Sequence, residues 1–411
     1  MVVVRPFRAI RPKASLADKV AELPYDVVDS SQARDLAEGN PYSYFHIDKA
    51  EIDLAQSISP YDAQVYQKAA ANLTAFLQKG WLKKDIQDNY YLYQLTMNGR
   101  SQTGLVACTS IDDYSAANIK KHEYTRHEKE IDRMNHIRSC DANTSPIFLS
   151  YRKNQEIQQL IQNWQKTHEA IYDFTSYYEV EHKVWLLDDK TIIQQLEEAF
   201  TALDALYIAD GHHRTESAVK IGLEKREEQT NSMESDYFLS ILFPEDELLI
   251  KEYNRVLDVK IPEDFFARLK ENFVLEETNE KRPDNAAKMC MYLEGTWYSL
   301  QVKKDKIPTD PVAKLDVSLL QELLITPIFN IQDVRSDQRI DFVGGIYGPQ
   351  KLEELVDEKK GTVAFSMYPT KMQDLLEVAD AQEIMPPKST WFEPKLLSGL
   401  FLHDLETTAK P

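Results

Sequence analysis

Two spacings of hydrophobic residues recur along the chain and predict alternating helices and strands. Residues 60–80 place apolar side chains about every 3.6 positions and end at Gly80, which predicts an amphipathic helix. Residues 90–110 contain two runs rich in aromatic and β-branched residues on either side of Asn98 and Gly99, a pair that favours a type I′ turn. We therefore expect a β-hairpin there. Further strands are expected in residues 1–12, 143–151, 205–210 and 236–243, and further helices in residues 120–140, 153–170 and 190–200.

The order of these elements predicts a mixed α/β (α+β) protein in which helices pack on mixed or antiparallel sheets. Helices and strands alternate without the regular βαβ spacing of a barrel. The 411 residues correspond to two or three domains. We expect an N-terminal α/β region in residues 1–150, a central region in residues 151–265 and a C-terminal α/β region in residues 266–411.

The net charge excludes some classes of partner. With 48 Lys and Arg against 67 Asp and Glu, the formal charge is -19, which repels nucleic-acid phosphates and anionic lipids. No apolar stretch approaches 18 residues, and the apolar run before Arg5 is too short for a signal peptide. The three cysteines are far apart and do not form a metal or redox motif. We therefore expect a cytoplasmic protein that binds neither nucleic acid nor membrane, while its oligomeric state is left open.

The strongest candidate for chemistry is the turn in residues 205–214, with the sequence ALYIADGHHR. An apolar strand runs into Gly211, and a helix starts directly after it, so free backbone N–H groups face whatever lies above the turn. Arg214 can bind a phosphate or carboxylate, and Asp210 can accept a proton or bind Mg²⁺. His212 and His213 titrate near neutral pH. The simpler interpretation is a helix cap with a solvated arginine. The density of functional groups favours instead a turn that takes part in binding or catalysis.

A second candidate is the segment KHEYTRHE, at residues 121–128. Arg126 stands where the zinc-binding HExxH motif needs its second histidine, so a metalloprotease is excluded. His122, Glu123 and Arg126, with Arg133 seven residues later on the same face of the expected helix, form a patch that can contact a phosphorylated ligand. A solvated, salt-bridged helix remains the alternative.

A third candidate is the proline-rich segment EIMPPKSTWFEPK, at residues 383–395. Its prolines fix the backbone, and Lys388, Ser389, Thr390 and Lys395 remain available as anion donors. The alternative is a kinked connection with buried aromatic residues.

A fourth candidate follows Pro24. Tyr25 and Asp26 offer an aromatic hydroxyl and a carboxylate beside a proline, together with the aromatic residues of 42–46. A simple turn is the alternative. The sequence contains neither a Walker loop nor a GxGxxG fingerprint.

With these segments, the chain resembles the DUF1015 family of bacterial and archaeal proteins. The resemblance covers nearly the whole length and rests on the runs VRPFRAIRP, ELPYDVVDSSQARDLAEGNPYSYFHI, HEYT with SPIFLSY, YIADGHHR and MPPKSTWFEPKLLSGL. The family name assigns no activity.

The DGHHR turn is similar to the phosphate-binding turn of ParB/sulfiredoxin-like domains, especially that of free serine kinases. The resemblance implies a ParB/sulfiredoxin-like nucleotide-binding core, with a catalytic role for Asp210 and phosphate binding by residues 211–214. It also implies ATP or ADP with Mg²⁺ near Asp210, and serine or phosphoserine as the substrate. The length of the chain departs from small kinases of that type, which leaves the HEYT and MPPKST segments without counterparts.

The leading hypothesis is a small-molecule phosphotransferase in which Asp210 or Glu123 acts as the base, assisted by His212 and His213. Gly211, Arg214, His122, Arg126 and Arg133, with the donors of the proline-rich segment, would bind the nucleotide or its phosphates, while Tyr25 and Asp26 contact the substrate. The same geometry run in reverse removes phosphate from phosphoserine, so kinase and phosphatase remain open. A nucleotide- or amino-acid-binding regulator without turnover is the alternative, and a ParB-like DNA-partitioning protein is disfavoured by the charge.

Overall fold

The computed structural model describes residues 1–230 and 232–406. The chain forms two compact units. Unit 1 contains residues 1–120, 125–248 and 394 onward, and unit 2 contains residues 121–124 and 249–393. These limits differ from the three regions expected from the sequence, because residue 150 lies inside a strand in the interior of the unit 1 sheet.

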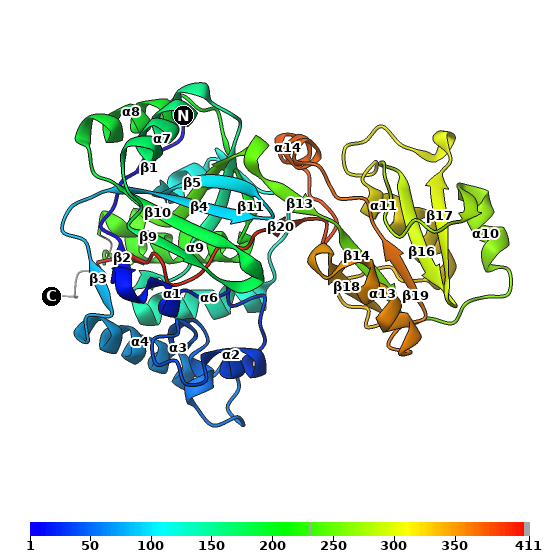
Figure 1. Cartoon of the computed structure of the whole chain (residues 1–411), viewed down its shortest axis with the longest axis horizontal. Helices are drawn as coiled ribbons and strands as arrows, with labels where there is room; N and C mark the ends of the chain where they lie inside the picture. The colour runs from blue at the N-terminus through cyan, green and yellow to red at the C-terminus, as the bar shows by residue number, and fades with distance from the viewer. Residues whose placement is uncertain (231, 407–411) are drawn as a thin grey trace. The chain divides into compact units, whose positions relative to one another are not determined.

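A nine-stranded mixed sheet forms the centre of unit 1 (Figure 1). Its strand order is β6-β11-β8-β12-β5-β4-β10-β9, and β1 also pairs with β5. Strand β8 is parallel to β12 and antiparallel to β11. The strands are β1 (Val4–Arg5), β4 (Tyr90–Met97), β5 (Arg100–Ser110), β6 (Ile119–Lys120), β8 (Ile147–Tyr151), β9 (Tyr172–Thr175), β10 (Glu181–Leu187), β11 (Leu206–Asp210) and β12 (Tyr237–Pro244).

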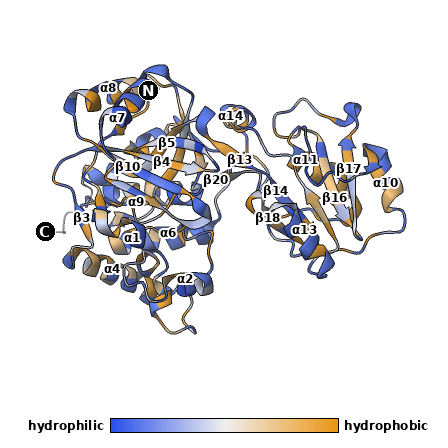
Figure 2. Cartoon of the chain, viewed as in Figure 1, coloured by the Kyte–Doolittle hydropathy of each residue, from blue (hydrophilic) through white to orange (hydrophobic). Residues whose placement is uncertain are grey.

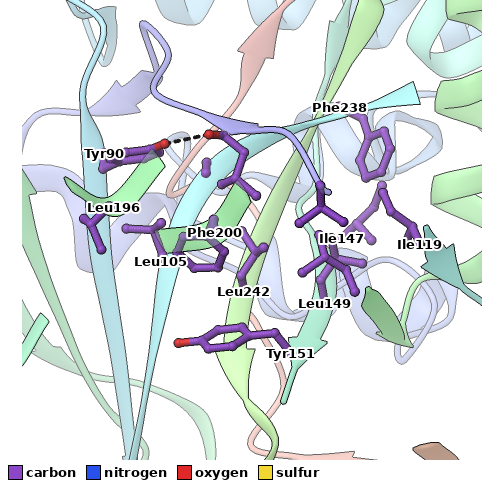
Figure 3. Packing of buried hydrophobic residues seen from close by; sticks show 14 of the residues in the cluster. Tyr90, Leu105, Ile119, Ile147, Leu149, Tyr151, Leu196, Phe200, Phe238 and Leu242 are labelled. Atoms are coloured by element: carbon purple, nitrogen blue, oxygen red, sulfur yellow. Dashed lines mark hydrogen bonds between the residues drawn. The ribbon is translucent and has the colours of Figure 1, made fainter. Parts of the chain in front are cut away.

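The main core of unit 1 lies on one face of this sheet. Apolar side chains from α7, α8 and α9 pack there against alternate residues of the central strands, including Leu105, Ile147 and Leu242 (Figure 3). The buried Tyr90 hydroxyl donates a hydrogen bond to the Val4 carbonyl at 2.8 Å. The helices of unit 1 are α1 (Ala17–Val20), α2 (Ser30–Ala37), α3 (Phe45–Asp48), α4 (Ala63–Gln78), α5 (Ile111–Ser115), α6 (His127–Cys140), α7 (Gln155–Thr167), α8 (Lys190–Thr201) and α9 (His212–Glu227).

Phe401, in the segment of residues 394–406, packs against the other face of the sheet. Phe401 contacts the rings of Tyr91 and Tyr93, with ring centroids 5.2 and 6.2 Å apart. Two short sheets lie beside it, formed by β2 (Ile10–Pro12) with β3 (Leu82–Lys84) and by β7 (Ala142–Asn143) with β21 (His403–Asp404). The last segment is therefore part of unit 1, although it is remote in sequence.

Unit 2 has a six-stranded sheet in the order β15-β17-β16-β19-β14-β18. Its neighbouring strands are antiparallel throughout. The strands are β13 (Leu249–Lys251), β14 (Tyr253–Leu257), β15 (Phe273–Glu277), β16 (Lys288–Leu293), β17 (Thr296–Val302), β18 (Ile340–Gly344), β19 (Val363–Ser366) and β20 (Trp391–Glu393), of which β13 and β20 form a separate pair. The helices are α10 (Phe265–Asn272), α11 (Asp316–Leu320), α12 (Thr326–Phe329), α13 (Gly348–Asp357) and α14 (Met372–Asp380).

The mixed α/β class expected from the sequence is confirmed, and so are its clearest elements. The predicted helix in residues 60–80 is α4, and it ends just before Gly80, which has a φ of 64°. The predicted hairpin is β4–β5, with positive φ at both Asn98 and Gly99, as a type I′ turn requires. The helices α7 and α8 carry hydrophobic and hydrophilic faces (Figure 2), as their sequence spacing predicts.

Two expected elements differ from the structure. The strand expected in residues 1–12 is split into β1 and β2, because Pro6 lacks the N–H that a continuous ladder needs. The helix expected over residues 120–140 begins only at His127, the first residue of α6. The carbonyl of His122 accepts a hydrogen bond from Met385 N at 2.9 Å and so takes part in a long-range contact within unit 2. Arg126 is therefore the N-cap of α6 and does not share a helical face with Arg133.

Within the residues that the structure describes, no helix has both the length and the apolar character needed to cross a membrane.

Candidate active site

The turn between β11 and α9 is built around Gly211. Its φ of 94° is left-handed, and a Cβ at this position would lie 3.1 Å from Arg214 Nε. Gly211 N donates a hydrogen bond to Asp210 Oδ1 at 2.8 Å. Gly211 is the N-cap of α9 and has no side chain with which to cap the first turn. The helix therefore presents backbone donors and the positive end of its dipole beside the Asp210 carboxylate.

Asp210 forms an ion pair with Lys395. Lys395 Nζ lies 3.1 Å from Asp210 Oδ2, and the Asp210 side chain is 30% exposed. Burial by itself raises the pKa of Asp210, but the positive charges of Lys395 and Arg214 outweigh it and hold that pKa well below the ordinary value. Asp210 is therefore a carboxylate at every physiological pH.

His213 binds the segment that precedes α6. Its Nε2 accepts a hydrogen bond from Arg126 N at 2.9 Å, so this nitrogen carries no proton and the neutral ring is protonated on Nδ1. Burial lowers the pKa of His213, and Arg126 and Lys129 lower it further. His213 is thus a neutral imidazole at pH 7. His212 is buried at the start of α9.

Arg214 is a buried cation. It is 8% exposed, and its Nη1 donates a hydrogen bond to the Pro146 carbonyl. Its Nε is buried and has no hydrogen-bond partner among the described residues. Burial tends to lower the pKa of Arg214, but Asp26 and Asp210 raise it above the ordinary value. The guanidinium is therefore charged, and its Nε–H group is available to donate a hydrogen bond.

Arg133 is a second buried cation, but it is fully paired. Its Nε donates a hydrogen bond to Asp132 Oδ2 at 2.9 Å, and its Nη1 lies 3.4 Å from Asp48 Oδ1. The guanidinium stacks 3.9 Å from the ring centroid of Tyr25. Ser145 donates a further hydrogen bond to Asp48 Oδ2 at 3.0 Å. This network fixes the orientation of Arg133 and Tyr25.

A small cavity joins these groups. It has a volume of about 20 Å³, and its wall includes Tyr25, Arg133, Thr144, Ser145 and Arg214. That volume accommodates about one water molecule, and the polar wall offers the partners a water needs. The cavity therefore lies between the two arginines and can hold a small polar group.

The structure brings together parts of all four segments that the sequence singled out, within unit 1. Asp210 joins Lys395 of the proline-rich segment, and His213 joins Arg126. Tyr25, Arg133 and Arg214 share the cavity wall, while Asp26 is exposed. The other predicted residues lie in unit 2, which contains His122, Glu123, Lys388, Ser389 and Thr390.

Sequence reasoning missed the acidic partners of Arg133 and the role of Lys395 as a counter-ion. Asp48 is 3% exposed and closes the short helix α3. In the sequence, the only indication of a buried Asp48 is that this carboxylate directly follows the largely apolar and aromatic residues 42–47. Ser145 precedes Pro146 in residues 143–151, for which the sequence pattern predicts only a strand.

Among the described residues, no three His, Cys, Asp or Glu side chains are placed to hold a metal ion together. A single carboxylate does suit Mg²⁺ that arrives with a nucleotide, because Mg²⁺ usually takes one or two protein carboxylates and completes its shell with phosphate oxygens and water.

The fold and site thus define a mixed α/β protein in which a strand–glycine–helix turn places the N-terminus of α9 beside the Asp210 carboxylate. A family model described as "Protein of unknown function (DUF1015)" matches residues 4–318, so the chain belongs to the DUF1015 family. A search of curated proteins gave no significant match.

Among solved structures, the chain is similar to three proteins at low identity. One is a free serine kinase in complex with AMP, with 11% identity, a TM-score of 0.37 and coverage of 70% of this chain and 86% of that one. SbnI with a C-terminal truncation, from Staphylococcus aureus, has 12% identity, a TM-score of 0.40 and coverage of 71% and 85%. A conserved hypothetical protein from Pyrococcus furiosus has 11% identity, a TM-score of 0.35 and coverage of 72% and 94%. These values are too low to transfer an activity.

Proposed function

We propose that this chain is a phosphotransferase that acts on a small hydroxyl metabolite, such as serine or phosphoserine, together with ATP or ADP. One observation carries the proposal: an ionised carboxylate, Asp210, lies at the N-terminus of α9 between the cations Lys395 and Arg214. The helix end and the cations suit phosphate oxygens, and the carboxylate suits a substrate hydroxyl. The nucleotide is inferred from the resemblance of the DGHHR turn.

The transfer requires little covalent chemistry from the protein. The hydroxyl oxygen of the substrate attacks the terminal phosphorus, the bond from that phosphorus to the bridging oxygen breaks, and the hydroxyl proton passes to a carboxylate. Asp210 is the proposed acceptor; Glu123, the other base that the sequence predicts, belongs to unit 2 and is not part of this site. Because its pKa is low, Asp210 acts mainly by orienting the hydroxyl and accepts the proton only as the new bond forms.

The remaining residues around the turn bind the phosphate groups and orient the reactants. Arg214 offers its free Nε–H to a phosphate oxygen, while Tyr25 and Arg133 line the adjoining cavity. The neutral His213 holds the Arg126 backbone in place beside the turn. Mg²⁺ bound with the nucleotide would neutralise phosphate charge beside Asp210. In the proposal, Gly211, His212 and Arg126 bind the nucleotide or assist the transfer, and Asp26 joins Tyr25 at the substrate.

The experiment is a phosphate-transfer assay on purified protein with Mg²⁺. Serine is supplied with ATP or with ADP, and phosphoserine is supplied with and without ADP. We expect transfer in at least one combination and its loss in Asp210→Asn, while Asp173→Asn, which changes a carboxylate that is 61% exposed in the same unit, behaves as wild type. The productive combination also gives the direction of transfer. No turnover in any combination would contradict the proposal.

The alternative function is a ligand-binding regulator without turnover. The buried Arg214 Nε without a hydrogen-bond partner among the described residues supports it, because an anionic ligand can bind this donor and the helix end without any proton acceptor. Ligand binding measured by calorimetry, together with no turnover, would support this alternative.

A further inference from the structure

Arg255 in unit 2 is a buried cation without an acidic partner. It lies in β14 and is 4% exposed. No Asp or Glu among the described residues lies within ion-pair distance of its guanidinium, whereas the buried Arg133 has both Asp48 and Asp132. A buried charge that lacks a counter-ion is costly to a fold. Its presence in a strand core therefore calls for a physical reason.

The contacts of Arg255 satisfy hydrogen bonds without balancing its charge. Nη1 donates to the Tyr253 carbonyl, and Nη2 donates to the Lys388 carbonyl at 3.0 Å. The guanidinium carbon lies 5.3 Å from the ring centroid of Phe342. Burial lowers the pKa of Arg255 to about 10, an unusual direction for an arginine. The group remains charged at neutral pH and lacks a local negative charge.

A second cation, Lys388, belongs to the segment whose carbonyl accepts a hydrogen bond from Arg255. Lys388 is exposed, and its Nζ lies 5.5 Å from the ring centroid of Tyr253. It also has no ion-pair partner in the part of the chain that the structure describes. The segment around it is held by several bonds: Ser389 Oγ donates to the Pro386 carbonyl at 2.6 Å, and Thr370 Oγ1 donates to the Ser389 carbonyl at 2.8 Å.

The backbone of Lys388 is itself constrained. Its φ of 59° is left-handed, a conformation that costs free energy for a residue with a side chain. Its carbonyl accepts the hydrogen bond from Arg255, so this bond links the buried cation directly to the strained residue. Strain of this kind persists where surrounding contacts fix it and is concentrated at ligand-binding positions.

We propose that Arg255 and Lys388 form a subsite for a phosphoryl oxyanion, the group shared by inorganic phosphate, nucleotides and phosphorylated metabolites. Two cations without carboxylate partners match the double negative charge of a phosphoryl group better than the single charge of a carboxylate. This subsite lies in unit 2 and is separate from the proposed transferase activity. Phosphate binding there can therefore be tested without measuring turnover.

A purely structural interpretation makes the opposite prediction about stability. If Arg255 serves to clamp the 385–391 segment, then Arg255→Met removes two hydrogen bonds and lowers the melting temperature. If its charge is retained for a ligand, Arg255→Met removes an uncompensated buried charge and leaves the melting temperature equal or higher in the absence of phosphate.

The test measures melting temperature and phosphate affinity on the full chain at constant ionic strength. Inorganic phosphate, ADP and phosphoserine are titrated by calorimetry into wild type, Arg255→Met and Lys388→Gln. Arg335→Gln is the matched control, because Arg335 is half-exposed and pairs with Asp333 in the same unit. We expect phosphate affinity at one site to fall at least tenfold in both variants, with Arg335→Gln unchanged and the melting temperature of Arg255→Met not reduced. The ligand whose affinity falls most in these variants is the one that the subsite binds best.

Two results would overturn the proposal. One is phosphate binding of wild-type strength and stoichiometry in both Arg255→Met and Lys388→Gln. The other is a lower melting temperature of Arg255→Met with an unchanged response to phosphate. Lys388 is exposed, so Lys388→Gln keeps the test decisive if Arg255→Met does not fold. Loss of turnover in Asp210→Asn, measured separately, reports on the proposed function and not on this subsite.

Discussion

The ion pair between Asp210 and Lys395 sets the charge state of the candidate active site. Burial opposes the ionisation of Asp210, and Lys395 is the first of the neighbouring cations that overcome it. We predict that Lys395→Met raises the pKa of Asp210, so that the acid limb of turnover against pH moves to higher pH by about one unit or more. The measurement is a pH profile of kcat/KM. Lys183→Met, which removes an exposed ion pair with Asp173, is the control. An acid limb that does not move would contradict the assignment.

Glu22 gives a pH prediction for folding stability. It is 3% exposed, and burial raises its pKa to about 7, although hydrogen bonds from the Ser43 and Tyr177 hydroxyls oppose this shift. Between pH 4.5, near its ordinary pKa, and pH 7, the folded chain keeps a proton that the unfolded chain releases. Stability should therefore fall as pH rises through this window, by about 1–3 kcal/mol from this group.

Urea denaturation at pH 5 and pH 8 tests the prediction for Glu22. Glu22→Gln should lose most of the difference between the two pH values, whereas Glu38→Gln, at an exposed position, should keep it. The same pH dependence in wild type and Glu22→Gln would show that Glu22 is not the group responsible.

At the residue scale, the sequence predicts a functional residue where the residues next to it in the chain define its local structure. Gly211 and Arg214 could be identified because a strand, a glycine and a helix start follow one another within a few residues. Asp48 and Arg255 could not, because each depends on burial by segments remote in sequence. Lys395 was predicted as an anion donor, and its position opposite Asp210 depends on the last segment of the chain returning to unit 1.

At the scale of single elements, helix α9 positions the site and depends on Gly222 for its packing. A Cβ at Gly222 would lie 2.5 Å from the Ser235 carbonyl oxygen and 2.7 Å from Ile111 Cδ1. Replacing glycine by alanine in a helix usually gains about 1 kcal/mol, but overpacking against a backbone carbonyl costs about 1–3 kcal/mol. We predict that Gly222→Ala is destabilising overall. Chemical denaturation measures it, with Leu223→Ala at an exposed neighbouring position as the control; a stabilised Gly222→Ala would contradict the packing.

The sequence predicted elements best where local chemistry sets them. The hairpin at Asn98 and Gly99 follows from the positive φ that these residues tolerate, and α4 follows from its apolar spacing. The start of α6 could not be predicted, because the hydrogen bond from Met385 N to the His122 carbonyl joins residues more than 200 positions apart.

At the scale of the whole molecule, the division into two units follows no single boundary in the sequence. Residues 121–124 belong to unit 2, and the segment from residue 394 onward belongs to unit 1. The composition does not change at these positions, so only the pairing of remote segments defines the units. The sequence therefore predicted the mixed α/β class but not the division of the chain.

The net charge of -19 gives a prediction for the whole molecule. Long-range repulsion from phosphates should prevent binding to duplex DNA even at low salt, where attraction between a basic protein and DNA is strongest. A gel-shift experiment with a duplex of random sequence should show no retardation up to micromolar protein. Retardation that weakens as salt increases would contradict the prediction and support a DNA-binding role.

The central claim is that Asp210 contributes to chemistry and not to ligand binding alone. The most direct measurement compares nucleotide affinity, by calorimetry, with kcat for wild type and Asp210→Asn. We predict that Asp210→Asn lowers kcat by about 100-fold or more while the Kd for nucleotide changes by less than about tenfold. An Asp210→Asn variant that binds and turns over as wild type does would contradict a catalytic role of Asp210, and binding by both proteins without any turnover would identify the turn as the site of a regulator.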